Sequence, residues 1–195
     1  IEQLKTFLNK GRFLLVFKYA ESIVKNYPNS FIVWNILGIS AYEIRKIDYA
    51  IKSYKKAISI NSKYEHAYNN LGILLSSQGK IDSAIEAYKK AILNKPDNAL
   101  FHNNLGAVLL EQGKNKEAKE ACKKAISLKS DYAEAYNNLG AILRDEGKIS
   151  EAIESCKKAI LLKSDYAEAY NNLGAILRDE GKIADAIEAC KKATL

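Results

Sequence analysis

The sequence predicts an all-α solenoid of stacked helix pairs, and two observations support this prediction. Residues 128–149 return without change at 162–183, which sets a period of 34 residues. In the same register, a glycine recurs in every repeat from Gly38 to Gly174. A period of this length is typical of repeat architectures, in which each repeat buries its apolar surface against its neighbours. We therefore expect one continuous domain rather than separate globular cores.

Residues 1–30 read as a diverged or partial first repeat. Ile1–Lys10 and Arg12–Asn26 have the pattern of two short amphipathic helices, and Gly11 separates them. Gly11 and Pro28 fall at the positions where later repeats carry their own turn residues. Terminal repeats of an array are commonly atypical.

Five regular repeats cover residues 31–195, and they begin at residues 31, 65, 99, 133 and 167. Apolar or small residues at repeat positions 4, 7, 8 and 11 have the spacing of one helical face. A second stripe at positions 20, 24 and 27 predicts a second helix, and a glycine between the stripes, such as Gly147, marks the turn. Asp82 and Ser150 are predicted N-caps of second helices. Asp131 with Glu134 has the spacing of a capping box at the start of a first helix, and this pair recurs one repeat later.

Three cysteines, Cys122, Cys156 and Cys190, occupy the same position of consecutive repeats. Equivalent helices of a stack lie at least about 8–10 Å apart, whereas a disulfide requires Cα atoms within about 7 Å. We therefore predict buried, reduced thiols, which fit the cytoplasm. No apolar run approaches the roughly 20 residues that span a bilayer, so no membrane insertion is expected.

The net charge of +7 is confined to one end of the chain. Residues 1–64 hold 11 Lys and Arg against 4 Asp and Glu, whereas residues 65–195 hold 19 of each. Neutral repeats argue against a nucleic-acid partner. Lysine pairs such as Lys89–Lys90 lie four residues after a glutamate, which favours a solvated outer face. With two histidines and no phosphate-binding loop, the sequence predicts neither an enzyme, a cofactor nor a metal site.

The repeat pattern resembles the tetratricopeptide repeat. It has an aromatic residue at position 4, Leu at 7, Gly at 8, Ala at 20, an aromatic at 24, Ala at 27 and Pro at 32. The second regular repeat carries it almost complete, as Tyr68, Leu71, Gly72, Ala84, Tyr88, Ala91 and Pro96. His102 replaces one aromatic residue, and cysteine replaces another in three repeats. The resemblance implies a right-handed superhelix of antiparallel helix pairs, whose first helices line a concave groove for an extended peptide or a partner helix.

The groove positions implied by this resemblance are rich in asparagine. The predicted peptide-binding residues are Asn35, Asn69, Asn103, Asn137 and Asn171 at position 5, Asn70, Asn104, Asn138 and Asn172 at position 6, and Arg144 and Arg178 at position 12. A carboxamide can both donate a hydrogen bond to a peptide group and accept one from it. The superhelical arm of O-linked N-acetylglucosamine transferase has a similar ladder at position 6, which implies a backbone-binding role for the four position-6 residues. The asparagines could also serve only to shape the groove.

The predicted function is a protein–protein interaction module, and two alternatives stay open. The sequence starts at Ile1, contains no methionine and ends at Thr194–Leu195 inside an expected helix. We therefore also consider a substrate-recruiting arm of a larger enzyme of the glycosyltransferase or sulfotransferase type. The other alternative is a scaffold that self-associates through its open C-terminal edge.

Overall fold

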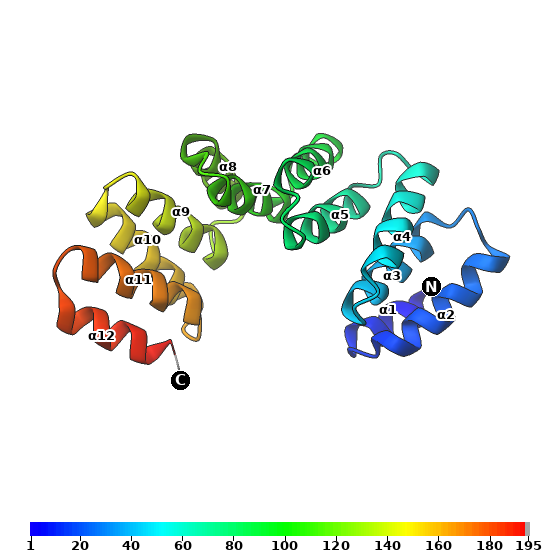
Figure 1. The fold of residues 1–195 in the computed structure, drawn as a ribbon, viewed down its shortest axis with the longest axis horizontal. Helices are drawn as coiled ribbons and strands as arrows, with labels where there is room; N and C mark the ends of the chain where they lie inside the picture. The colour runs from blue at the N-terminus through cyan, green and yellow to red at the C-terminus, as the bar shows by residue number, and fades with distance from the viewer. Residues whose placement is uncertain (194–195) are drawn as a thin grey trace. The chain divides into compact units, whose positions relative to one another are not determined.

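The computed structural model describes residues 1–193, and over this span the chain forms twelve α-helices and no strand (Figure 1). The first helices of the pairs are α1 (Glu2–Asn9), α3 (Phe31–Glu43), α5 (Glu65–Ser77), α7 (Ala99–Glu111), α9 (Ala133–Asp145) and α11 (Ala167–Asp179). The second helices are α2 (Phe13–Asn26), α4 (Ile47–Ile60), α6 (Ile81–Asn94), α8 (Asn115–Leu128), α10 (Ile149–Leu162) and α12 (Ile183–Lys192). The predicted all-α fold, with one helix pair per 34 residues, is confirmed. Residues 194–195, where the sequence was expected to end inside a helix, lie outside the described span.

The chain divides into two compact units, Ile1–Pro96 and Asp97–Leu195, which we call the N-terminal and C-terminal units. Within each unit, the two helices of a pair pack against each other, and each second helix packs against the next first helix. First helices of consecutive repeats are also in contact, as α3 with α5 in the N-terminal unit and α9 with α7 and α11 in the C-terminal unit.

Small residues at two positions of the second helices allow this close packing. The fully buried alanines at repeat positions 20 and 27 are Ala50, Ala57, Ala84, Ala91, Ala118, Ala125, Ala152 and Ala159. Gly140 of α9 provides the matching space on the first helix, because a Cβ atom built there would lie 2.5 Å from Cys156 Sγ and 3.3 Å from the Ala152 carbonyl oxygen. In the first two regular repeats a tyrosine ring takes the place of the sulfur, since Tyr54 covers Gly38 in the same way.

Two further positions of the first helices contribute to the core. Repeat positions 3 and 10 are buried in successive repeats, as Phe101 and Val108, Ala135 and Ile142, and Ala169 and Ile176. Residues seven apart lie on the same side of a helix. Each first helix therefore buries a second stripe beside the predicted one at positions 4, 7, 8 and 11.

The predicted side-chain caps are wrong. Asp82 and Ser150 lie at the second residue of α6 and α10, and a lysine is the N-cap of both helices without any side-chain cap hydrogen bond. Tyr132 is the N-cap of α9, so Asp131 lies one residue before the cap. The turn after each glycine enters the helix one residue earlier than expected, because the apolar residue before Asp82 or Ser150 is already helical. Asp82 instead lies in the first turn, where a negative charge favours the helix dipole.

Arg45 stands at the turn position that glycine holds in the later repeats. Its φ of 63° lies in the left-handed region, as do those of Gly79, Gly113, Gly147 and Gly181. That region costs a non-glycine residue about 1–2 kcal/mol, whereas glycine adds about 0.5–1 kcal/mol of unfolded-state entropy. Arg45→Gly is therefore expected to raise the free energy of unfolding by roughly 0.5 kcal/mol, measured by urea unfolding. Gly79→Arg is the reverse change and should destabilise the chain; a variant of Arg45 less stable than the parent would contradict the interpretation.

Candidate functional site

Asparagine side chains at repeat positions 5 and 6 link consecutive first helices of the C-terminal unit. Asn138 Nδ2 on α9 donates to Asn103 Oδ1 on α7 over 3.0 Å. One repeat later, Asn172 Nδ2 on α11 donates to Asn137 Oδ1 on α9 over 2.8 Å. The position-6 carboxamide of each repeat therefore binds the position-5 carboxamide of the preceding repeat.

The N-terminal unit contains the same bond. Asn70 Nδ2 on α5 donates to Asn35 Oδ1 on α3 over 3.1 Å. Its recurrence in three places follows from the sequence, because the period repeats both asparagines in the same register. We refer to the position-6 residues Asn70, Asn104, Asn138 and Asn172 as the asparagine ladder.

The position-5 asparagines lie between helices. Four of the five predicted ones are buried: Asn35, Asn69, Asn103 and Asn137. Asn137 is 0% exposed, and its Nδ2 donates to Glu168 Oε1 on α11 over 3.0 Å. Asn35 Nδ2 in turn donates to the Tyr64 hydroxyl at 3.5 Å. These side chains stabilise the contact between repeats, whereas the fifth, Asn171, is exposed.

Tyrosines that precede the first helices complete this inter-repeat network. Burial raises the pKa of the Tyr132 and Tyr166 hydroxyls, and neighbouring glutamates raise it further. Asn103 and Asn137 are in hydrogen-bond contact with these two hydroxyls and act on the pKa in the opposite direction. Both tyrosines are therefore neutral at physiological pH and take part as hydrogen-bonding groups. The sequence analysis did not identify them, although their spacing of 34 residues was a usable signal.

The ladder residues are accessible in part. Asn70, Asn104, Asn138 and Asn172 are all of intermediate exposure. The bond to the preceding repeat uses one donor of the Asn138 and Asn172 amino groups and fixes which way each carboxamide points. Within residues 1–193, the Oδ1 atoms of Asn138 and Asn172 accept no protein hydrogen bond. Each of these side chains thus retains one acceptor oxygen and one N–H.

The two predicted arginines differ in their surroundings. Arg144 Nε donates to Asp179 Oδ2 over 2.7 Å, and a terminal nitrogen of the same guanidinium lies 2.7 Å from that oxygen. Arg178 lies 3.2 Å from Asp179 Oδ1, and its side chain is 64% exposed. Hydrogen bonds from Arg144, and secondarily from Arg178, lower the pKa of Asp179. Arg144 therefore joins α9 to α11, while Arg178 is the more accessible cation.

The lysine pairs of the second helices are exposed. Lys90 pairs with Glu86 at 3.0 Å and Lys192 pairs with Glu188 at 2.8 Å, both with the predicted spacing of four residues. Surface ion pairs of this kind contribute little to stability. This arrangement is typical of a solvated outer face.

Two searches of the described residues gave no site of another kind. No cluster of His, Cys, Asp and Glu side chains within residues 1–193 could hold a metal ion. In the same span, every helix is too short or too polar to cross a membrane. His66 is exposed, with Nε2 3.7 Å from Glu65 Oε1, and His102 is half-buried.

The three cysteines are free, and their burial differs. Cys122 and Cys156 are fully buried, and this burial raises the pKa of both thiols to about 12. Cys190 is exposed, contrary to the expectation of three core thiols. Because the thiolate is the reactive form, we expect a thiol reagent at about pH 8 to modify only Cys190 in the native chain. Mass spectrometry should find one modification without denaturant and three with it; rapid native labelling of Cys122 or Cys156 would contradict their placement.

Family models match most of the chain. A model described as a TPR repeat matches residues 42–79, 74–113, 108–145 and 140–179. A second, described as a tetratricopeptide repeat, matches residues 167–195. A comparison with curated proteins gave no match.

Solved structures with a similar fold include several repeat proteins. A crystal structure of MamA is 28% identical, with a TM-score of 0.70, over 81% of this chain and 92% of MamA. The Cut9–Hcn1 complex of the APC/C aligns at 21% identity and a TM-score of 0.86, over 97% of this chain and 38% of the compared chain. YrrB, described as a TPR protein with an unusual peptide-binding site, is 21% identical with a TM-score of 0.70, over 89% of this chain and 90% of YrrB.

The helix pairs, the 34-residue period and the matched models agree on one family, because four overlapping matches and a fifth cover residues 42–195. The chain belongs to the tetratricopeptide repeat family.

Proposed function

We propose that the asparagine ladder binds the backbone of an extended peptide. The family supports the coarser function, a scaffold for protein–protein interaction. The finer proposal rests on one observation: the carboxamides of Asn138 and Asn172 are each oriented by a bond to the preceding repeat and each keep one acceptor oxygen and one N–H. An extended peptide offers the complementary N–H and C=O groups at regular intervals.

Preorganisation adds to this proposal. A side chain already held in one orientation loses little conformational entropy when a ligand binds. The ladder contacts follow the repeat period and carry no information about peptide side chains, so the proposed surface reads backbone more than sequence. Arg178, exposed beside Asp179, is the charged group that favours an acidic residue at one end of the ligand. YrrB offers a likeness of fold and a described peptide-binding site, and the peptide class is our extension to this chain.

A peptide array tests this function. The test variant carries Asn70→Ala, Asn104→Ala, Asn138→Ala and Asn172→Ala, and the matched control carries Lys89→Ala, Lys123→Ala and Lys157→Ala on the second helices. Each lost hydrogen bond is worth about 0.5–1.5 kcal/mol, so we expect binding to weaken at least about tenfold in the ladder variant and to persist in the control.

Circular dichroism must accompany the array. The ladder variant leaves the Oδ1 atoms of Asn35, Asn103 and Asn137 without their donors, so both variants are compared below their melting temperatures. Peptide binding that is unchanged in a folded ladder variant, or lost equally in the control, would contradict the proposal.

A further inference from the structure

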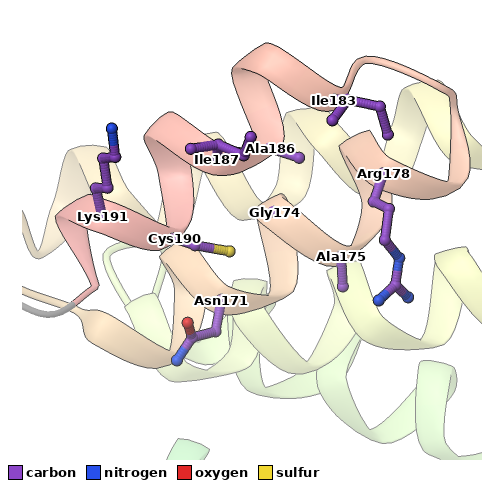
Figure 2. Close-up of a pocket in the computed structure, with 9 residues that line it drawn as sticks. All are labelled: Asn171, Gly174, Ala175, Arg178, Ile183, Ala186, Ile187, Cys190 and Lys191. Carbon is purple, nitrogen blue, oxygen red and sulfur yellow. The ribbon is translucent and has the colours of Figure 1, made fainter.

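A cavity of about 640 Å³ opens on the face formed by α11 and α12. Figure 2 shows Asn171, Ala175 and Arg178 on α11, with Ile183 and Ile187 on α12. Ile183 and Ile187 are 54% and 52% exposed, and both belong to an otherwise apolar lining. We call this surface the α11–α12 face.

The same surface occurs one repeat earlier, where the chain itself covers it. Residues 128–149 and 162–183 are identical in sequence. Asn137 and Cys156 are fully buried, whereas their equivalents Asn171 and Cys190 are exposed. The difference is α11, which packs against both α9 and α10. The covered copy therefore shows which chemistry the open copy accepts.

Three polar side chains of α11 recognise the covered surface. Glu168 accepts from Asn137 Nδ2 over 3.0 Å, and Asn172 donates to Asn137 Oδ1 over 2.8 Å. Asp179 accepts from Arg144 Nε over 2.7 Å. These residues stand at positions i, i+4 and i+11, which fall on one side of a helix. Their counterparts on the α11–α12 face are Asn171 and Arg178.

We propose that the α11–α12 face docks an amphipathic helix of a separate protein, one that carries a carboxylate, a carboxamide and a second carboxylate at positions i, i+4 and i+11. The carboxylate at i accepts from Asn171, the carboxamide at i+4 donates to it, and the carboxylate at i+11 pairs with Arg178. Apolar residues on the same side of the helix cover Ile183 and Ile187. The site is thus a continuation of the inter-repeat interface and is separate from the asparagine ladder's peptide surface.

Charge distinguishes a separate partner from a second copy of the chain. The face carries Arg178 and Lys191 among its lining residues and therefore favours an acidic helix. The helix of a second copy that has the required residues, α11, already packs against its own α9 and α10. The exposed first helix, α1, is followed by Lys10 and Arg12, and its Glu2 is paired with its own Lys5 at 2.8 Å. It lacks the acidic pattern of α11.

The test uses a peptide with the sequence of residues 163–183, which reproduces α11 and its flanking turns. Fluorescence anisotropy measures its binding to the full chain, and the labelling rate of Cys190 reports occupancy, since this thiol lines the cavity. We expect saturable binding, slower Cys190 labelling, and a loss of affinity of about tenfold or more for a peptide carrying Glu168→Lys and Asp179→Lys.

Two protein variants locate the contact. Ile187→Glu places a charge in the cavity and is expected to abolish peptide binding. Leu93→Glu is the matched control, because Leu93 is 81% exposed on α6 in the other unit, and it should bind as the parent does. Equal binding of both peptides, undiminished binding by Ile187→Glu, or no binding with unprotected Cys190 would overturn the proposal. A concentration-dependent dimer of the unmodified chain that Ile187→Glu disrupts would assign the face to a second copy and contradict it as well.

Discussion

Gly140→Leu is expected to lower the free energy of unfolding by about 3 kcal/mol, because overpacking forces the paired helices apart. Even a Cβ atom at Gly140 would lie 2.5 Å from Cys156 Sγ, and the carbonyl oxygen of Ala152 lies 3.3 Å away on the backbone of α10. The sulfur can be displaced only at the expense of the core, since Cys156 is fully buried. Urea unfolding followed by circular dichroism measures the effect.

A double-mutant cycle separates the steric effect from other consequences of this change. Gly140→Ala alone adds the single Cβ atom that meets Cys156 Sγ, and Cys156→Ala alone removes the sulfur. The two changes combined should be less destabilising than the sum of the single changes, because the new methyl group occupies the vacated space. A near-normal unfolding curve for Gly140→Leu, or additive effects in the cycle, would show that α9 and α10 do not pack in this register.

Asn137→Ala is expected to cost about 2 kcal/mol, whereas Asn171→Ala should cost less than about 0.5 kcal/mol. The two residues stand in identical sequence, so intrinsic helix propensity is the same for both. Asn137 is buried and bonds to Glu168 and Asn172, while Asn171 is exposed. Removal of Asn137 leaves these partners without the groups they bind.

The comparison of these two variants isolates the inter-repeat bonds. Both are measured by thermal and urea unfolding under the same conditions, and Asn171→Ala serves as the control for the loss of an asparagine side chain. Equal destabilisation would mean that the Asn137 bonds contribute nothing, and that position 5 has another role.

The sequence predicted the fold because the period and the apolar spacing are local properties. Each first helix of the regular repeats begins at the residue where the repeat was expected to begin, from Phe31 to Ala167. Alanine at positions 20 and 27 was correctly interpreted as a means of close approach between helices, since small side chains have this effect in any stack.

The site was less predictable, because exposure depends on neighbours that a single repeat does not reveal. Asn137 and Asn171 have the same flanking sequence, yet one is a buried bridge and the other is exposed. The pairing of Arg144 with Asp179 likewise joins residues 35 positions apart, so the local pattern showed only that Asp145 stands next to Arg144. The caps were wrong for a related reason: Asp82 fits an N-cap statistically, but the turn fixes the start of α6 one residue earlier.

The most direct test of the proposed function is an NMR titration of the asparagine side chains with a peptide selected on the array. Side-chain amide signals of Asn104, Asn138 and Asn172 report the ladder of the C-terminal unit. Asn94 on α6 is the control, because its Nδ2 donates to the Lys90 carbonyl oxygen over 3.0 Å on a second helix. The proposal predicts that the ladder signals shift in proportion to occupancy while the Asn94 signal does not. Saturating peptide that leaves the three ladder signals unchanged would contradict a backbone-binding role for these carboxamides.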